Sequence, residues 1–344
     1  MIGIGVIGYG YWGPNLVRNF SQVEGATMVA VCDQDQSRLD RVSKLYPAML
    51  TFDDVDALLA DPTIDAVAIA TPVTTHFPLA KRALEAGKHV FVEKPFTATS
   101  AEGDTLVALA DERGLTLMVD HTFIYTSAVR KIHELTQSGE LGQLYYYDSV
   151  RVNLGLFQSD VSVMWDLAVH DLSIMDYLLD QDPISVAATG VAHVAGQPKN
   201  MAYITCMFPD NLIAHFHVNW LAPVKVRQTL LCGSEKMVVF DDVDMSEKVK
   251  VYDKGVVFAD NDESAVYQRH VGYRTGDMWA PRLDNIEALA IETQHFVDCI
   301  SSGETPLSDG RAGVRIVRIL EAADESMAAN GIPISIEHRP RANP

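Results

Sequence analysis

Residues 2–14 read IGIGVIGYGYWGP, and this stretch decides the fold of the first part of the chain. Its first six residues form an apolar run that is typical of a strand buried on both faces of a sheet. Three glycines follow at the G-x-G-x-x-G spacing, where the first permits a tight turn, the second lets a pyrophosphate approach and the third packs helix against strand. We predict a dinucleotide-binding turn, and its expected cofactor-binding residues are Gly8, Gly10, Tyr11, Trp12 and Gly13.

An acidic residue stands where such a turn selects its cofactor. A second apolar run, residues 28–32, ends at Asp33, twenty residues after Gly13. A carboxylate there accepts hydrogen bonds from both hydroxyls of the adenosine ribose and repels a 2′-phosphate. The sequence therefore predicts NAD rather than NADP as the cofactor. The alternative is a glycine-rich turn within another kind of α/β fold.

Strand and helix patterns alternate through the rest of the first third of the chain. This alternation predicts right-handed βαβ units and a parallel sheet of the Rossmann type. The expected strands are residues 66–70, 90–92 and 116–120, and the expected helices are residues 53–60, 78–85 and 100–113.

Ligands bind at the carboxyl ends of the strands in such a sheet. Thr71 and Pro72 close the strand over residues 66–70, so we expect them beside the nicotinamide or its ribose. His76 follows shortly after and has two interpretations, a cofactor contact or a helix cap.

Residues 90–95, VFVEKP, place an acid, a base and a helix breaker at a strand end. Proline disfavours the α conformation in the residue before it, so Lys94 is expected to stay extended at the end of the strand. Its amine then reaches the ligand edge, and both Lys94 and Glu93 are predicted to contact the cofactor. The alternative is an ordinary surface lysine before a turn.

The pattern changes after about residue 122 and predicts a second domain over residues 123–344, following a NAD-binding domain over residues 1–122. Short links and alternating polarity indicate a mostly antiparallel sheet with one open face. The expected strands are residues 144–154, 184–194, 202–208, 212–220, 226–231 and 237–240, and the expected helices are residues 127–138, 163–179, 285–301 and 313–329.

The predicted helix over residues 163–179 carries Asp166 and His170, four residues apart and therefore on one helix face. A carboxylate beside an imidazole raises its basicity and fixes its tautomer. Oxidation of an alcohol by NAD needs such a proton acceptor, since an unperturbed imidazole ionises near about pH 6.5 and a lysine amine only near about 10.4. Our hypothesis is that His170 accepts the proton, Asp166 orients it and Lys94 binds the reacting oxygen. A surface ion pair on the helix is the alternative, and Lys94 as the base stays open.

The composition narrows the classes of partner. The net charge of −19 disfavours nucleic acid and anionic membranes. Four scattered cysteines and a strand directly at the N-terminus predict a cytoplasmic protein with reduced thiols. His215, His217 and Asn219 alternate on one strand, but no nearby acid or cysteine completes a ligand set, so we predict no metal site.

These motifs resemble the Gfo/Idh/MocA oxidoreductases over essentially the whole chain. The motifs that carry the resemblance are the glycine turn with Asp33, residues 70–76, residues 86–90, residues 93–95 and residues 166–171. The resemblance implies a Rossmann domain followed by an α/β domain with a large open sheet. It also implies subunit contact through that sheet, as a homodimer or homotetramer, and catalytic roles for Lys94, Asp166 and His170.

Within the family, residues 8–19 and 151–155 resemble members that act on nucleotide-linked sugars. The implied activity is NAD-dependent oxidation of UDP-N-acetylglucosamine at C3, for amino-sugar synthesis in lipid A or surface polysaccharide. Arginine suits a diphosphate. The expected substrate-binding residues are Lys94, Arg151, Asn153, Asp166, His170 and Arg274. The alternatives are a dehydrogenase of a free polyol or sugar, such as an inositol, and a non-catalytic NAD-binding regulator.

Overall fold

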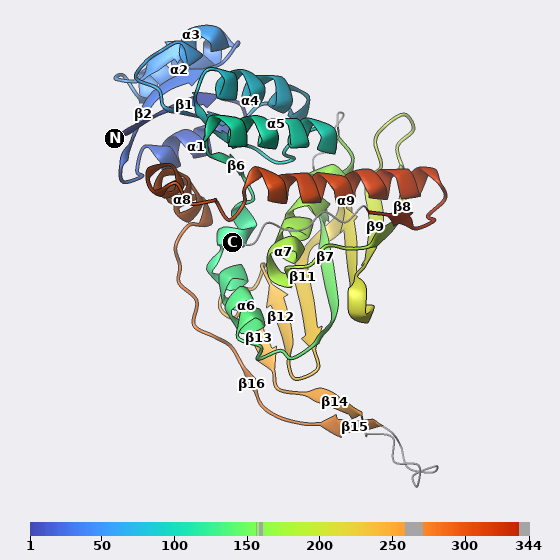
Figure 1. Ribbon diagram of the computed structural model, residues 1–344. Helices are drawn as coiled ribbons and strands as arrows, with labels where there is room; N and C mark the ends of the chain where they lie inside the picture. Colours follow the sequence, from blue (N-terminus) through green and yellow to red (C-terminus); the bar gives the residue numbers. More distant parts are fainter. Residues whose placement is uncertain (156, 158–160, 259–270, 337–344) are drawn as a thin grey trace. The chain divides into compact units, whose positions relative to one another are not determined.

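The computed structural model describes residues 1–155, 157, 161–258 and 271–336 (Figure 1). Contacts divide the chain into two compact units. Unit 1 contains Met1–Thr126 and Ile286–Glu321, and unit 2 contains Ser127–Asn285 and the described residues from Ala322 on. The two contiguous domains predicted from the sequence, 1–122 and 123–344, do not include this return of the chain to unit 1.

Unit 1 contains a six-stranded parallel sheet with the strand order β3-β2-β1-β4-β5-β6. The chain builds outward from β1 to β3 and then continues from β4 on the other side of β1. Such a reversal of strand order is the place where α/β sheets bind ligands. The strands are β1 (Ile2–Ile7), β2 (Ala26–Cys32), β3 (Leu50–Phe52), β4 (Ala66–Ile69), β5 (His89–Val92) and β6 (Leu117–Val119).

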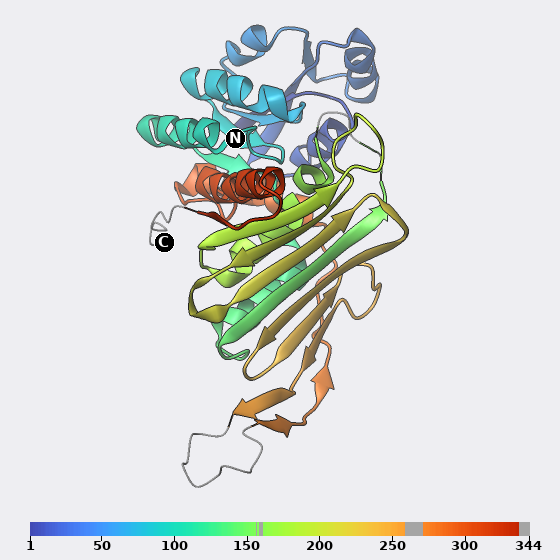
Figure 2. The same ribbon diagram turned by 90° about the vertical axis from the view of Figure 1, so that its right-hand side faces the viewer.

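Helices cover both faces of this sheet (Figure 2). The right-handed connections from β1 to β3 run in the opposite direction across the sheet to those from β4 to β6, so they place their helices on opposite faces. The rings of Phe20, Phe91 and Phe296 meet edge to face, with centroids 5.5–6.1 Å apart, so α8 packs with α1 against β5. The helices of unit 1 are α1 (Gly13–Phe20), α2 (Gln36–Leu45), α3 (Val55–Leu59), η1 (Val73–Thr75), α4 (His76–Glu85), α5 (Ser100–Arg113), η2 (Thr122–Tyr125), α8 (Ala288–Ser302) and the first part of α9 (Gly310–Ala328).

Helix α5 shows how local sequence sets an element's bounds. The Thr99 side chain and Glu102 form a capping box at its start, and Gly114 ends it with φ +62°. The predicted helix over residues 100–113 is confirmed.

Over its described residues, unit 2 contains a nine-stranded sheet with the order β16-β13-β12-β11-β7-β10-β9-β8-β17. Its pairs are antiparallel except β7 with β10, so the sheet is mixed and mostly antiparallel. The strands are β7 (Leu144–Leu154), β8 (Ser185–Val191), β9 (Met201–Met207), β10 (Ile213–Asn219), β11 (Leu221–Gly233), β12 (Met237–Asp241), β13 (Val249–Tyr252), β16 (Met278–Trp279) and β17 (Ile334–Ser335), with β14 (Gly255–Phe258) and β15 (Val271–Arg274) as a separate pair.

Helices α6 (Ser127–Gln137) and α7 (Val169–Leu179) cover one face of this sheet, and Figure 2 shows the opposite face. On the opposite face, Tyr203 stacks on His217 with ring centroids 4.4 Å apart and on His215 at 6.0 Å. His215 Nδ1 also lies 3.0 Å from the Thr205 hydroxyl, so these histidines take part in contacts along the sheet. Among the described residues, no helix combines the length and the hydropathy that a bilayer crossing requires.

Candidate active site

The glycine turn after β1 has the steric properties that cofactor binding requires. Gly8 has φ +97°, and a Cβ atom there would lie 2.5 Å from the Ala70 carbonyl oxygen. A Cβ atom on Gly13 would lie 2.1 Å from the Gly8 carbonyl oxygen, so both positions exclude a side chain. At Gly10 the nearest atom to such a Cβ is Arg38 Nη1 at 3.7 Å, which leaves room for a pyrophosphate.

Asp33 lies at the end of β2, and its carboxylate is fixed beside this turn. Its Oδ2 accepts the Tyr9 N–H at 2.6 Å and lies 3.2 Å from Arg38 Nη1, while Oδ1 accepts the Asp35 N–H at 2.9 Å. A held carboxylate next to an open turn fits the adenosine ribose of NAD. Arg38 is a partner that the sequence did not reveal.

Glu93 and Lys94 directly follow β5, at the strand end where the sequence placed them. Glu93 is buried, and its Oε2 accepts the Lys94 backbone N–H at 3.0 Å. The Glu93 N–H donates to the Ile69 carbonyl at 2.9 Å, which aligns the ends of β4 and β5. Lys94 therefore follows directly on a strand end at the carboxyl edge of the sheet.

His76, for which we expected a cofactor contact or a helix cap, lies where η1 ends and α4 begins. Its ring is buried at the start of α4, with Nε2 2.8 Å from the Thr71 carbonyl oxygen and Nδ1 2.9 Å from the Pro95 carbonyl oxygen. Burial lowers the pKa of His76, and the two carbonyls oppose that shift. Because both nitrogens face backbone oxygens, the ring joins the Thr71–Pro72 segment to Pro95.

Trp12 and Tyr11 differ in their surroundings although they are neighbours. The Trp12 indole Nε1–H donates to Asp120 Oδ2 at 2.9 Å, and the Thr122 hydroxyl donates to Asp120 Oδ1 at 2.5 Å. Tyr11 is 92% exposed. Trp12 thus links the glycine turn to the end of β6, and the sequence had not indicated Asp120 as its partner.

In unit 2, Asp166 lies in a π-helical turn, Met164–Ala168, that leads directly into α7. We expected one continuous helix over residues 163–179, and π turns of this kind are frequent at functional sites. The buried Trp220 donates its indole N–H to Asp166 Oδ2 at 3.1 Å. A Cβ atom on Gly155 would lie 2.5 Å from Trp220 Cδ1, so this glycine makes room for the indole.

Arg151, which we expected to bind the diphosphate, has an acidic partner within the protein. Its guanidinium is buried on the central strand β7, where Nε and Nη2 donate to Asp171 Oδ2 and Oδ1 at 2.8 and 2.9 Å. A bidentate pair of this kind leaves little capacity for an external anion. Asn153, also on β7, is half-buried. Arg274 on β15 bonds the Asp253 carboxylate and the Glu235 carbonyl, so it too has protein partners.

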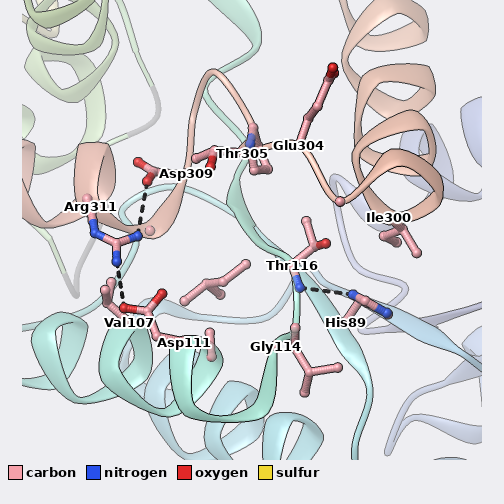
Figure 3. Close-up of a pocket in the computed structure, with 16 residues that line it drawn as sticks. His89, Val107, Asp111, Gly114, Thr116, Ile300, Glu304, Thr305, Asp309 and Arg311 are labelled. Carbon is pink, nitrogen blue, oxygen red and sulfur yellow. Dashed lines mark hydrogen bonds and ion pairs between the residues drawn. The ribbon is translucent and has the colours of Figure 1, made fainter. Parts of the chain in front are cut away.

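A pocket of about 320 Å³ lies in unit 1 near the amino ends of β5 and β6 (Figure 3). Its Arg311 pairs with Asp111 at 2.5 Å and lies 3.6 Å from Asp309, and the Thr116 N–H donates to His89 Nδ1 at 2.9 Å. Since it lies at the amino edge of the sheet, away from the glycine turn, we do not assign the chemistry to it.

Two family models match the chain. One, described as an oxidoreductase family with an NAD-binding Rossmann fold, matches residues 2–121, and the other, the GFO/IDH/MocA C-terminal domain, matches residues 129–239. Together with the sheet order and the glycine turn, the first match defines an NAD-binding Rossmann oxidoreductase. The chain belongs to the Gfo/Idh/MocA family, as its motifs predicted.

Individual relatives span nearly the whole chain. UDP-N-acetylglucosamine 3-dehydrogenase of Acidithiobacillus ferrooxidans is 28% identical over 318 residues, which cover 91% of this chain and 93% of that protein. A solved structure of that enzyme superimposes with a TM-score of 0.80, covering 96% and 99% of the two chains at 28% identity. The NAD-dependent scyllo-inositol 2-dehydrogenase of Bacillus subtilis is 25% identical over 98% of this chain and 95% of that protein.

An oxidoreductase of Agrobacterium radiobacter, solved in complex with NAD⁺, L-tartaric acid and magnesium, has a TM-score of 0.81. At 20% identity over 97% and 98% of the two chains, this likeness shows the fold alone. NAD is the cofactor of this protein by its match to the NAD-binding family model, in agreement with the prediction from Asp33.

Proposed function

We propose that this protein oxidises the C3 hydroxyl of UDP-N-acetylglucosamine to the 3-keto sugar, with NAD as the hydride acceptor. Family membership supports the reaction class in this proposal, that of an NAD-dependent oxidoreductase of the sugar dehydrogenase type. The observation that carries the finer part is the similarity to UDP-N-acetylglucosamine 3-dehydrogenase over more than nine tenths of both chains. The product would supply an aminotransferase in the synthesis of lipid A or surface polysaccharide.

The proposed roles of the residues follow from their chemistry. NAD, held at the glycine turn and Asp33, would supply the hydride acceptor when bound. His170 accepts the hydroxyl proton, and Asp166 orients the imidazole. Trp220 keeps the Asp166 carboxylate in place through its indole N–H. Lys94 donates a hydrogen bond to the reacting oxygen, from a strand end that the Glu93 carboxyl group and the His76 ring hold in place.

Two variants test this assignment. His170→Asn and Lys94→Met should each lower turnover by about a hundredfold, the contribution typical of a positioned acid–base group, while the Kd for NAD changes little. NAD reduction at saturating substrate measures turnover, and fluorescence titration measures NAD binding. Near-normal turnover of His170→Asn, with a pH profile that depends on Lys94 alone, would make Lys94 the base.

A free polyol is the second candidate substrate, and one observation favours it. Arg151 and Arg274, the two arginines we expected to hold a diphosphate, both have protein partners. Initial rates of NAD reduction with UDP-N-acetylglucosamine, N-acetylglucosamine, scyllo-inositol and myo-inositol separate the candidates. Turnover of an inositol without turnover of the nucleotide sugar would refute the first proposal, and turnover of none would favour a non-catalytic NAD-binding regulator.

Subunit contact through the sheet of unit 2 is a further part of the proposal. Tyr203, Met207 and Ile213 expose apolar surface on β9 and β10, each with more than a third of its surface accessible. Large exposed apolar patches on a sheet are typical of protein contacts. A homodimer or homotetramer formed through this face is therefore our expectation.

A further inference from the structure

Three carboxyl groups meet in the interior of unit 1. Strands β5 and β6 pair with Val92 opposite Val119, and the Asp120 N–H donates to the Val92 carbonyl at 2.8 Å. Glu93 and Asp120 follow these paired residues, so they occupy adjacent strand ends. Glu292 on α8 completes the group, and the exposures of Glu93, Asp120 and Glu292 are 9%, 2% and 0%. We call these three residues the acid cluster.

Asp120 is the member of the acid cluster that accepts two side-chain hydrogen bonds. Its Oδ2 accepts the Trp12 indole N–H at 2.9 Å, and its Oδ1 accepts the Thr122 hydroxyl at 2.5 Å. An indole N–H is a donor only, so Oδ2 must present a lone pair to it.

Glu292 has the opposite environment. Both of its carboxyl oxygens are buried, and neither has a hydrogen-bonding partner among the described residues. Burial first, and then the charge of Asp120, raise the pKa of Glu292 well above its ordinary value. Burial and Asp120 raise the pKa of Glu93 in the same way. A negative charge near a buried carboxyl group disfavours ionisation of that group.

We propose that Glu292 is a positioning residue for NAD binding, because as a neutral acid it adds no negative charge beside the carboxyl group that accepts the Trp12 indole N–H. Asp120 then keeps Trp12, a residue of the glycine turn, bonded to the end of β6. Ionisation of Glu292 adds a buried negative charge, which repels Asp120 and strains its bond to Trp12. NAD binding is thereby coupled to the protonation of a residue on α8, a helix that follows unit 2 in the chain.

Other titratable groups lie around Glu292 and must be distinguished from it. Lys94 acts on Glu93 and opposes the rise in its pKa. His121 is buried directly after Asp120. Tyr125 of η2, whose ring lies 5.6 Å from that of His295, has a pKa raised by burial and then by Glu292. A pH dependence counts for the proposal only when it changes with Glu292 itself.

The test measures the Kd for NAD with the full chain, by isothermal titration, between about pH 7 and about pH 9. For the wild type we expect Kd to rise by about tenfold over this range, the equivalent of one hydrogen bond to a charged group. Glu292→Gln presents a neutral amide at all these pH values, so its Kd should rise by less than about twofold. Glu304→Gln makes the same change at an exposed acid just beyond the end of α8, so it is the matched control and should keep the wild-type slope.

Several outcomes would overturn the proposal. These are a flat wild-type profile, a wild-type slope in Glu292→Gln, or a slope lost in Glu304→Gln. Stability gives an independent readout if NAD binding of a variant is poor. Because the folded pKa of Glu292 is raised, wild-type stability is present below the unfolded pKa of the acid and is lost as pH rises toward the folded pKa. The melting temperature of Glu292→Gln minus that of the wild type should therefore increase between about pH 7 and about pH 9. If this difference were the same at both pH values, the proposal would also be refuted.

Discussion

Replacing Arg151 by Met decides whether this arginine is structural or binds the substrate. The Arg151 and Asp171 side chains are 3% and 4% exposed and are joined by two hydrogen bonds. Removing one partner of a buried pair costs about 3–5 kcal/mol in the free energy of unfolding, because the other charge is left buried. In a unit of this size each kcal/mol lowers the melting temperature by about 2–4 °C, so we expect a loss of about 6–20 °C.

Thermal unfolding followed by circular dichroism measures the effect, and two further variants sharpen it. Arg274→Met removes a half-buried arginine on β15, whose partner Asp253 stays partly in water, and should leave the melting temperature nearly unchanged. Arg151→Met combined with Asp171→Leu removes both buried charges and should recover most of the lost stability. If Arg151→Met unfolded like the wild type but raised the KM for UDP-N-acetylglucosamine, the buried ion pair would not be the role of Arg151.

Two other predictions concern the carboxylates of the site. Trp220→Phe removes the indole N–H from Asp166 and should lower turnover by about tenfold, the value of one hydrogen bond to a charged group. Steady-state kinetics should show no change in the KM for NAD. Unchanged turnover would show that Trp220 has no part in catalysis. Asp33→Ser removes the ribose acceptor beside Arg38 and should reduce the preference for NAD over NADP by about 10- to 100-fold in kcat/KM, and an unaltered preference would contradict the role of Asp33.

Features set by near neighbours in the sequence were predictable. The G-x-G-x-x-G turn, the acid at Asp33 and the capped helix α5 depend on residues within one or two elements, and the structure has them where the sequence predicted. The strand end before Pro95 belongs to the same class. In each case a steric or hydrogen-bonding requirement acts over a short stretch, so spacing alone carries the information.

Features that depend on distant partners were not predictable. The β7 face with Tyr147, Ser149 and Arg151 looks polar in the sequence, but all three residues are buried. The reason is that β7 lies between β10 and β11 and that Arg151 meets Asp171, which comes twenty residues later. The contacts of His76 were unpredictable for the same reason, since its partner carbonyl at Pro95 is nineteen residues away.

Two tryptophans show why residue type alone could not predict the contacts of the candidate site residues. Trp12 donates to Asp120 in unit 1, and Trp220 donates to Asp166 in unit 2. An indole N–H cannot accept a proton, so in both places it secures a carboxylate without competing for protons, which a lysine or histidine at the same position would do. This matters where a neighbouring group must gain or lose a proton during each turnover. The pairing leaves no signature in either sequence segment, because the residues of each pair are 108 and 54 positions apart. Substitution by Phe should therefore change the melting temperature little at either tryptophan. Trp12→Phe should instead weaken NAD binding, and Trp220→Phe should lower turnover.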